Sequence, residues 1–337
     1  MKGDVTILAV ETSCDETAAA VVRNGRQVLS NEVASQIKIH AKYGGVVPEI
    51  ASRHHTEIID TIIQAALKDA GLSYGDMDAV AVTYGPGLVG ALLTGVSTAK
   101  ALAYALHKPI VGVHHIEGHI AANYIAYPEL TPPFLCLAVS GGHTHLIHVK
   151  GYREFDLIGR TRDDAAGEAF DKVARVLGLG YPGGPAIDVA AKRSDSGYMD
   201  FPRVDIEDAP YDFSFSGLKT AVINHIHGIR QRGEELPMAD IAASFQQAVV
   251  DVLVGKSLLA CREAGIGTLV LAGGVSANTA LREHLAKNAK NQGVRVYVPP
   301  IEYCTDNAAM IGCAGYYRLT AGDVSDLSLN AVPGLPL

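Results

Sequence analysis

The 337-residue sequence lacks most of the features that mark secreted or disordered chains. Its five cysteines are scattered, odd in number and form no CxxC pair, and no signal peptide is evident at the N-terminus. These absences favour a reduced, cytoplasmic setting. Low-complexity tracts and long linkers are also missing, and only 19% of residues are charged against 48% hydrophobic. We therefore expect a globular chain, long enough for two domains with cores of their own.

A clear membrane-spanning segment is lacking too. The longest apolar stretch, residues 88–106, is interrupted by glycines and polar residues and contains Lys100. A membrane span needs about 20 mostly apolar residues. We expect a buried helix here and no membrane attachment.

Positive charge is in short supply. The chain has 28 Lys and Arg against 36 Asp and Glu, a formal net charge of −8. This balance excludes a protein that coats nucleic acid over its whole surface, although a local basic patch is compatible with it.

The order of the predicted elements suggests two similar α/β halves. In the first half we predict strands at 5–10, 18–22, 27–34, 79–84 and 109–113, and helices at 48–70 and 88–106. In the second we predict strands at 134–139, 145–149, 154–159, 268–271 and 294–298, and helices at 165–177, 218–230, 239–263, 279–291 and 306–319. Each half opens with three strands in a row, which indicates a duplication.

Two histidines in the segment His114-His115-Ile116-Glu117-Gly118-His119 have the spacing of metal ligands. Residues four apart, such as His115 and His119, share one face of a helix, and imidazole is the commonest side-chain ligand for transition metals. The pair directly follows an apolar strand, and sites gather at the carboxyl ends of such strands. An exposed or capping pair of histidines remains the alternative.

The same segment lacks the HExxH pattern of zinc peptidases. Ile116 occupies the position of the general base, and Glu117 lies about 200° round the helix from His115. A metal site without the peptidase base is therefore expected.

Three loops follow apolar strands and combine glycines with hydroxyl or acidic side chains, at residues 12–17, 140–144 and 272–278. Backbone N–H groups in such loops bind phosphate, although each loop alone could be an ordinary turn. Together they resemble the two phosphate loops and the adenosine loop of the actin/hexokinase/Hsp70 superfamily. Members of that superfamily hold adenine nucleotides between two RNase H-like halves.

A closer resemblance covers the chain from about Thr6 to Leu329. The segments that carry it are residues 11–17, 43–49, 85–88, 114–119, 140–144, 163–172, 181–185, 213–220, 272–278 and 304–307. In this order they resemble the bacterial TsaD family of tRNA threonylcarbamoyladenosine transferases. The resemblance implies an α/β fold of two RNase H-like lobes of the actin-like (ASKHA) superfamily with a central cleft. Residues 1–114 would form the first lobe, completed by a C-terminal helix at 306–325, and residues 115–305 the second lobe with insertions.

The resemblance also implies a metal centre. Its ligands would be His115, His119 and Asp306, which together would hold one divalent ion, Fe(II) or Zn(II). From the sequence alone, Asp306 is equally well explained as a helix N-cap.

Contacts with an adenine nucleotide or acyl-adenylate follow from the same resemblance. They map to Ala138, Val139, Ser140, Gly141, Gly142, Asp171, Gly184, Asp188 and Asn278. Carboxylates can accept hydrogen bonds from ribose hydroxyls, and an asparagine can reach an adenine edge. The alternative for Asp171 and Asp188 is solvated helix charge. Glu11, Asp15 and Glu16 are candidates for a catalytic proton transfer.

The implied reaction transfers a threonylcarbamoyl group from threonylcarbamoyl-AMP to the N6 amine of adenosine 37, in tRNAs that read codons beginning with A. The implied partners are a TsaB-type paralogue and a TsaE-type ATPase. The helix at 48–70 is a candidate dimerisation surface or, alternatively, a core helix. An ATPase or small-molecule kinase of the same superfamily, a metallopeptidase and a non-enzymatic assembly subunit are the competing interpretations.

Overall fold

The computed structural model describes residues 3–194 and 197–337. By contacts the chain divides into two compact units. The first comprises Met1–Pro132, Gly151–Glu154 and Pro299–Leu337, and the second comprises Pro133–Lys150 and Phe155–Val298.

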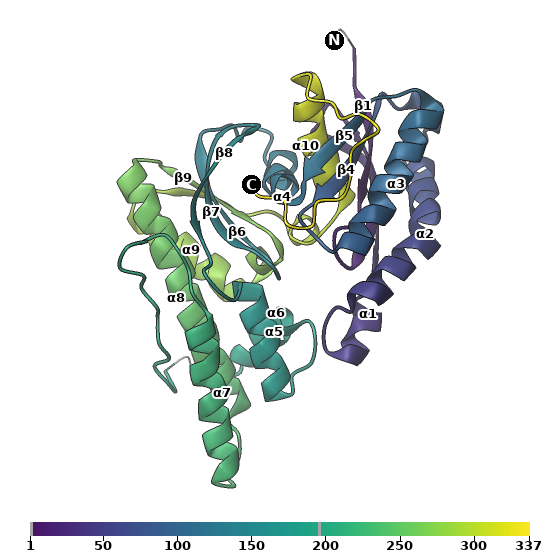
Figure 1. Ribbon diagram of the computed structural model, residues 1–337. Helices are drawn as coiled ribbons and strands as arrows, with labels where there is room; N and C mark the ends of the chain where they lie inside the picture. The colour runs from purple at the N-terminus through teal and green to yellow at the C-terminus, as the bar shows by residue number, and fades with distance from the viewer. Residues whose placement is uncertain (1–2, 195–196) are drawn as a thin grey trace. The chain divides into compact units, whose positions relative to one another are not determined.

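The first unit is built on a five-stranded mixed sheet in the order β3-β2-β1-β4-β5 (Figure 1). Its strands are β1 (Thr6–Glu11), β2 (Glu16–Arg23), β3 (Gln27–Ser35), β4 (Ala79–Gly85) and β5 (Ile110–His114). β1, β2 and β3 pair in antiparallel fashion, whereas β4 and β5 run parallel to β1. Every residue of β1 and β5 is buried, as expected for strands that are covered on both faces.

Helices cover both faces of this sheet. They are α1 (Ile37–His40), α2 (Pro48–Asp69), α3 (Val89–Leu106), α4 (His115–Ala126) and α10 (Ala308–Thr320), with 3-10 turns η1 (Ala41–Tyr43), η2 (Tyr74–Asp76) and η4 (Ile301–Tyr303). α2 and α3 pack on one face of the sheet, where Ile59 and Ile63 of α2 and Val96 of α3 join one core with Leu8 and Val10. The apolar face of α2 therefore belongs to the core, which decides between the two interpretations of that face.

α10 lies close against the sheet because it carries glycines at the contact. A Cβ atom on Gly312 would lie 2.6 Å from Val22 Cγ2, and one on Gly315 would lie 2.7 Å from the Ala81 side chain. Only a residue without a side chain allows the helix backbone to approach the strands this closely.

The second unit repeats the strand order of the first, as β8-β7-β6-β9-β10. Its strands are β6 (Phe134–Val139), β7 (Thr144–Gly151), β8 (Glu154–Arg160), β9 (Thr268–Ala272) and β10 (Arg295–Tyr297). β6 pairs antiparallel to β7 and parallel to β9, just as β1 does with β2 and β4. The shared order confirms the predicted duplication.

The helices of the second unit are α5 (Ala166–Leu177), α6 (Gly183–Ala191), α7 (Ser216–Gln231), α8 (Met238–Ala264) and α9 (Thr279–Asn291), with the 3-10 turn η3 (Gly274–Ala277). Leu135 and Leu137 of β6 share a core with Phe170 of α5 and Phe245 of α8. The predicted helices agree with those observed to within about two residues at each end, as is usual for helix termini.

Two helices, α3 and α8, are long and apolar enough to cross a membrane by length and composition alone. In α8, 67% of the tested window is buried inside the protein, and in α3 33% is buried. α8 is accordingly the core helix of its unit, whereas α3 keeps an apolar outer side that includes Val89, Leu93 and Tyr104.

The expected boundary at residue 114 differs from the division by contacts. α4 begins at His115 and packs on α10, where a Cβ atom on Gly118 would lie only 2.6 Å from Ile311 Cδ1. α4 therefore stays in the first unit, together with Asp306. As a result, all three predicted metal ligands belong to one unit.

Candidate metal centre and adenylate-binding turns

The two histidines lie at the start of α4, directly after β5. His114 caps the helix, since its Nδ1 accepts a hydrogen bond from the Ile116 amide at 3.1 Å. His115 and His119 follow on the same face, and their ring centroids are 4.6 Å apart. Both residues are buried, which excludes the alternative of an exposed pair.

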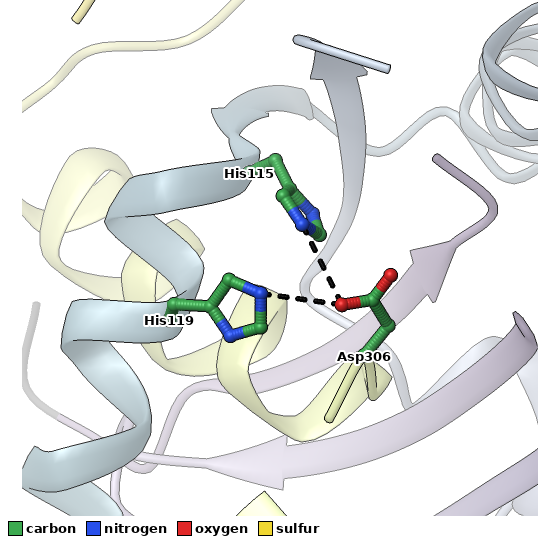
Figure 2. A group of neighbouring side chains, drawn as sticks. All are labelled: His115, His119 and Asp306. Atoms are coloured by element: carbon green, nitrogen blue, oxygen red, sulfur yellow. Dashed lines mark ion pairs between the residues drawn. The ribbon is translucent and has the colours of Figure 1, made fainter. Parts of the chain in front are cut away.

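Asp306 reaches both rings from the turn between η4 and α10. Its Oδ1 atom lies 3.5 Å from His115 Nε2 and 3.2 Å from His119 Nε2 (Figure 2). Asn307 is the N-cap of α10, because its side chain accepts a hydrogen bond from the Met310 amide at 3.0 Å. The capping alternative for Asp306 is thereby excluded.

The three side chains fit a bound cation. The three candidate ligand atoms lie within 4.8 Å of one another. Two ligands that are each about 2.1 Å from one ion, at tetrahedral or octahedral angles, are separated by about 3.0 to 3.4 Å. In addition, neither ring nitrogen of His119 has a hydrogen-bond partner among the described residues, and its approach to Asp306 lacks hydrogen-bond geometry. Such an unsatisfied buried group costs about 1–3 kcal/mol, which a cation at Nε2 would offset.

Negative charge is concentrated around the rings. Burial opposes the charged form of His115, but Asp306 and Glu11 outweigh it and raise the pKa of His115 to about 9. Burial, together with the charges of Asp306 and Asp15, raises the pKa of Glu16 to about 9. Like charges packed this closely disfavour one another's ionisation, and a cation would relieve the repulsion.

Glu117 lies away from the metal ligands, as predicted. Its Oε1 and Oε2 atoms accept hydrogen bonds from Arg318 at 2.7 and 2.9 Å. With the carboxylate held in this bidentate pair, α4 has no acid placed to act as a peptidase base.

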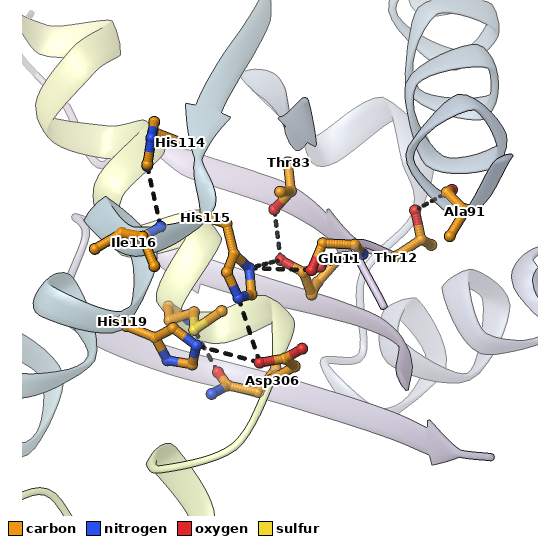
Figure 3. Close-up of polar contacts among 12 residues, drawn as sticks. Glu11, Thr12, Thr83, Ala91, His114, His115, Ile116, His119 and Asp306 are labelled. Atoms are coloured by element: carbon orange, nitrogen blue, oxygen red, sulfur yellow. Dashed lines mark hydrogen bonds and ion pairs between the residues drawn. The ribbon is translucent and has the colours of Figure 1, made fainter. Parts of the chain in front are cut away.

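Glu11, Asp15 and Glu16 occupy different environments at the ends of β1 and β2. Glu11 has no exposed surface, whereas Asp15 and Glu16 retain 8% and 9%. Glu16 accepts a hydrogen bond from Ser35, and Glu11 faces His115 with its Oε2 atom 3.2 Å from Nδ1. Thr83 and Ser13 were not among the predicted site residues, but both contact this group. Thr83 Oγ1 donates to Glu11 (Figure 3), and Ser13 Oγ lies 3.1 Å from His115 Nδ1. The signal available was the position of Thr83 at the end of the parallel strand next to β1.

In the second unit, residues 140–143 form a tight turn between β6 and β7. The Ser140 amide donates to the His143 carbonyl at 2.8 Å. Gly141 and Gly142 are exposed, and a Cβ atom on either would contact nothing within 4 Å. Gly167, at the start of α5, lies against this turn, since a Cβ atom there would be 2.5 Å from the Ser140 carbonyl oxygen.

Ala138 and Val139 precede the turn within β6 and are 2% and 1% exposed. Their side chains belong to the interior of the unit. Any contact with a ligand would therefore use their backbone.

Asp171 and Asp188 both have structural partners, Asp171 at the start of α6 and Asp188 at the start of α9. Asp171 Oδ1 accepts from the Gly183 amide at 2.7 Å, while a Cβ atom on Gly184 would have nothing within 4 Å. Asp188 Oδ2 accepts from Thr279 Oγ1 at 2.9 Å, and Asp188 Oδ1 has no hydrogen-bond partner among the described residues. At 8% exposure, Asp188 is not a solvated helix charge.

Asn278 is already committed within the protein. Its Oδ1 accepts from the Leu281 amide at 2.9 Å, which makes it the N-cap of α9, and its Nδ2 donates to Gln246 at 2.7 Å. One Nδ2 hydrogen and one Oδ1 lone pair remain for an adenine edge. Its neighbour Gly273 approaches the end of β6 closely, since a Cβ atom there would be 2.5 Å from the Val139 carbonyl oxygen.

A cavity of about 780 Å³ lies elsewhere in the second unit, between α8, α9 and residues 203–210. It includes none of the predicted site residues. The candidate site is therefore identified by the chemistry of its side chains and not by the size of a cavity.

Solved structures with the same fold have low sequence identity to this chain. HypF from T. kodakarensis aligns with a TM-score of 0.64 at 15% identity, covering 97% of this chain and 49% of that one. Component A of the (R)-2-hydroxyglutaryl-CoA dehydratase from Acidaminococcus fermentans aligns with a TM-score of 0.56 at 16% identity, covering 94% and 99%. These likenesses support the predicted two-lobe α/β fold of the actin-like type.

Sequence comparison is more specific. The family model described as "TsaD: tRNA N6-adenosine threonylcarbamoyltransferase" matches residues 27–313. A protein of that name from Clostridioides difficile is 56% identical over 334 residues, 99% of each chain. Another from Clostridium perfringens is 56% identical over 331 residues, 98% of each. The chain therefore belongs to the tRNA N6-adenosine threonylcarbamoyltransferase family.

Proposed function

We propose that the protein transfers a threonylcarbamoyl group from threonylcarbamoyl-AMP to the N6 amine of adenosine 37, in tRNAs that read codons beginning with A. The bond between the carbamoyl carbon and the phosphate oxygen breaks, a bond from N6 to that carbon forms, and AMP and a proton leave. Membership of the family supports the reaction type. The observation that carries the mechanism is the set of His115, His119 and Asp306, in which both histidines are buried.

These three side chains would hold one divalent cation, Fe(II) or Zn(II). Two imidazoles and one carboxylate leave coordination positions open for substrate. When bound, such an ion supplies Lewis-acid polarisation of a substrate oxygen, which helps because an aryl amine is a weak nucleophile.

The adenylate is assigned to the second unit. In the turn that begins at Ser140, the exposed Gly141 and Gly142 offer backbone N–H groups to phosphate, next to the first turn of α5. Backbone groups of Ala138 and Val139 lead into that turn.

Beside the turn, the start of α6 would receive the ribose. The open surface at Gly184 allows a close approach. Asp188 Oδ1, which has no hydrogen-bond partner within the described part of the chain, is the candidate acceptor for a ribose hydroxyl. Asp171 orders this helix start through Gly183, and Asn278 orders the start of α9.

Attack by the amine requires a proton acceptor. Asp15 and Glu16 are the candidates, because both keep some exposed surface. Glu16 could accept a proton only once a bound cation has lowered its raised pKa.

A chain of net charge −8 is a poor match for tRNA by itself. We assign part of the RNA contact to partners, a TsaB-type paralogue and a TsaE-type ATPase. The outer side of α3, which exposes Val89, Leu93 and Tyr104, is the candidate surface for the paralogue. The five free cysteines agree with a reduced, cytoplasmic location.

No observation favours the competing functions. A small-molecule kinase would bind Mg²⁺ through carboxylates and water rather than through paired imidazoles. A peptidase would need a base at the position of Ile116, and the neighbouring acid Glu117 is held by Arg318.

Transfer of labelled threonylcarbamoyl from threonylcarbamoyl-AMP to unmodified tRNA tests the proposal, with and without the partners and a chelator. We expect transfer that is abolished by the chelator and by His119→Ala, but not by His227→Ala on the exposed side of α7. Transfer that is unaffected by both the chelator and His119→Ala would contradict the role of the metal centre.

A further inference from the structure

We propose that Glu11 is a positioning residue for the metal ligand His115: held by Ser13 and Thr83, it keeps the proton on Nδ1 and directs the Nε2 lone pair at the cation. This inference rests on the proposed metal centre. It gives Glu11 a role distinct from that of Asp15 and Glu16.

The strand order brings these groups together. β1, β4 and β5 are parallel neighbours, with Val10 opposite Val82 and Thr83 opposite Val113. Glu11, Thr83 and His115 therefore emerge at the same carboxyl edge of the sheet, where parallel strands usually present functional groups.

At this edge Glu11 contacts both Thr83 and His115 (Figure 3). His115 Nδ1 lies 3.2 Å from Glu11 Oε2 and 3.1 Å from Ser13 Oγ. Thr83 Oγ1 donates to Glu11 Oε2, and the Ser13 amide donates to Glu11 Oε1. Both carboxylate oxygens thus accept from the protein, and the residue has no exposed surface.

This saturation decides between two roles for Glu11. A general base must reach the proton that it removes, either directly or through one water. A fully buried carboxylate with donors on both oxygens does not meet that condition. A carboxylate that accepts from the far nitrogen of a metal-bound histidine, by contrast, fixes the tautomer and makes the ligating nitrogen more basic.

Glu11→Gln tests the inference, because it keeps the size of the side chain and removes the charge. The matched control is Thr12→Val. Thr12 is equally buried in the same loop, but its hydroxyl donates to the Ala91 carbonyl at 2.9 Å, away from His115. Zinc affinity of the full-length chain is measured by competition with a chromophoric chelator.

Loss of such a carboxylate typically costs 10–100-fold in metal affinity. We expect a loss in that range for Glu11→Gln and an unchanged affinity for Thr12→Val. Thr83→Val, which keeps the carboxylate but removes one of its donors, should give a smaller loss. Nitrogen-15 spectra of the histidine rings in the zinc form should show a proton on Nδ1 of His115.

Zinc affinity of Glu11→Gln within twofold of the wild type, or a His115 ring protonated on Nε2, would overturn the inference. If Glu11→Gln does not fold, an affinity of Thr83→Val equal to the wild type would do the same. Transfer to tRNA is assayed separately, so zinc binding that depends on Glu11 without any transfer would refute the proposed function and leave this inference standing. A wild-type chain that binds no zinc would refute the metal centre and this inference with it.

Discussion

Gly118 lies where α4, which carries both histidines, packs on α10, which follows Asp306. It lies on α4 between His115 and His119. A Cβ atom at this position would be 2.6 Å from Ile311 Cδ1 and 3.3 Å from Met310 Cγ. Carbon atoms in contact are normally about 3.5–4.0 Å apart, so Gly118→Ala requires a local movement of about 1 Å.

We expect Gly118→Ala to lower the free energy of unfolding slightly and to lower the affinity for zinc measurably. Overpacking a core costs about 1–3 kcal/mol, and alanine regains about 0.5–1 kcal/mol over glycine in a helix interior. We therefore predict a net loss of about 1 kcal/mol in the free energy of unfolding. Zinc must restore the original spacing, since its ligand distances tolerate only about 0.2 Å, and its affinity should fall about five- to tenfold.

A double-mutant cycle with Ile311→Val isolates the contact, because valine lacks the Cδ1 atom. Alone, this substitution should cost about 0.5–1.5 kcal/mol. In combination, the two should be less destabilising than their sum by about 1 kcal/mol, and zinc affinity should recover. The control is Gly255→Ala in α8, where a Cβ atom has nothing within 4 Å and the helix should gain stability. Gly118→Ala as stable as the wild type, with unchanged zinc affinity, would refute the reasoning.

Three further predictions concern stability. Arg318→Met leaves Glu117 without its partner at 11% side-chain exposure, and should lower the free energy of unfolding in urea by about 2–3 kcal/mol; equal stability would show that the pair contributes nothing. At Asp163, burial acts to raise the pKa, but hydrogen bonds from Ser214, Ser216 and the backbone outweigh it and lower the pKa. The stabilisation by ionised Asp163 is therefore complete above the ordinary aspartate pKa of about 3.9, and it is lost as the pH falls through the lowered pKa of the folded state. The decrease in melting temperature caused by Asp163→Asn should accordingly become smaller in acid. A decrease that is the same at every pH would contradict this. Finally, zinc at 100 times its dissociation constant should add about 2.7 kcal/mol to the free energy of unfolding of the wild type, and a chelator should remove this gain. The free energy of unfolding of His119→Ala should change with neither zinc nor the chelator.

Sequence patterns predicted the local features of this fold well. Period-two and period-3.6 patterns located the strands and helices, and the spacing of His115 and His119 placed both on one face of α4. The position of Pro48 at the start of α2 was also predicted correctly, because proline fits the first turn of a helix at no cost.

Features that depend on packing between distant segments could not be predicted in this way. The lobe boundary expected at residue 114 separates α4 from α10, whereas the two helices pack together in one unit. This packing depends on the absence of a side chain at Gly118 and on the helix that follows Asp306. The burial of Asp188 and its bond to Thr279 depend on α9, about 90 residues further along the chain. No local pattern reports such contacts.

In the candidate site, too, the residue types could be predicted from the sequence but their packing could not. Residue types alone nominated Glu11, Asp15 and Glu16 together as proton-transfer candidates. Only the register of β1 beside β4 shows that Glu11 is enclosed by Thr83 and His115, whereas the other two acids keep some exposed surface.

The most direct test of the account is the anomalous scattering of crystals grown with Zn(II) and measured on both sides of the zinc absorption edge. We expect one strong peak about 2.0–2.2 Å from His115 Nε2, His119 Nε2 and Asp306 Oδ1. A zinc peak bound elsewhere, with these three side chains in place and no ion between them, would contradict it.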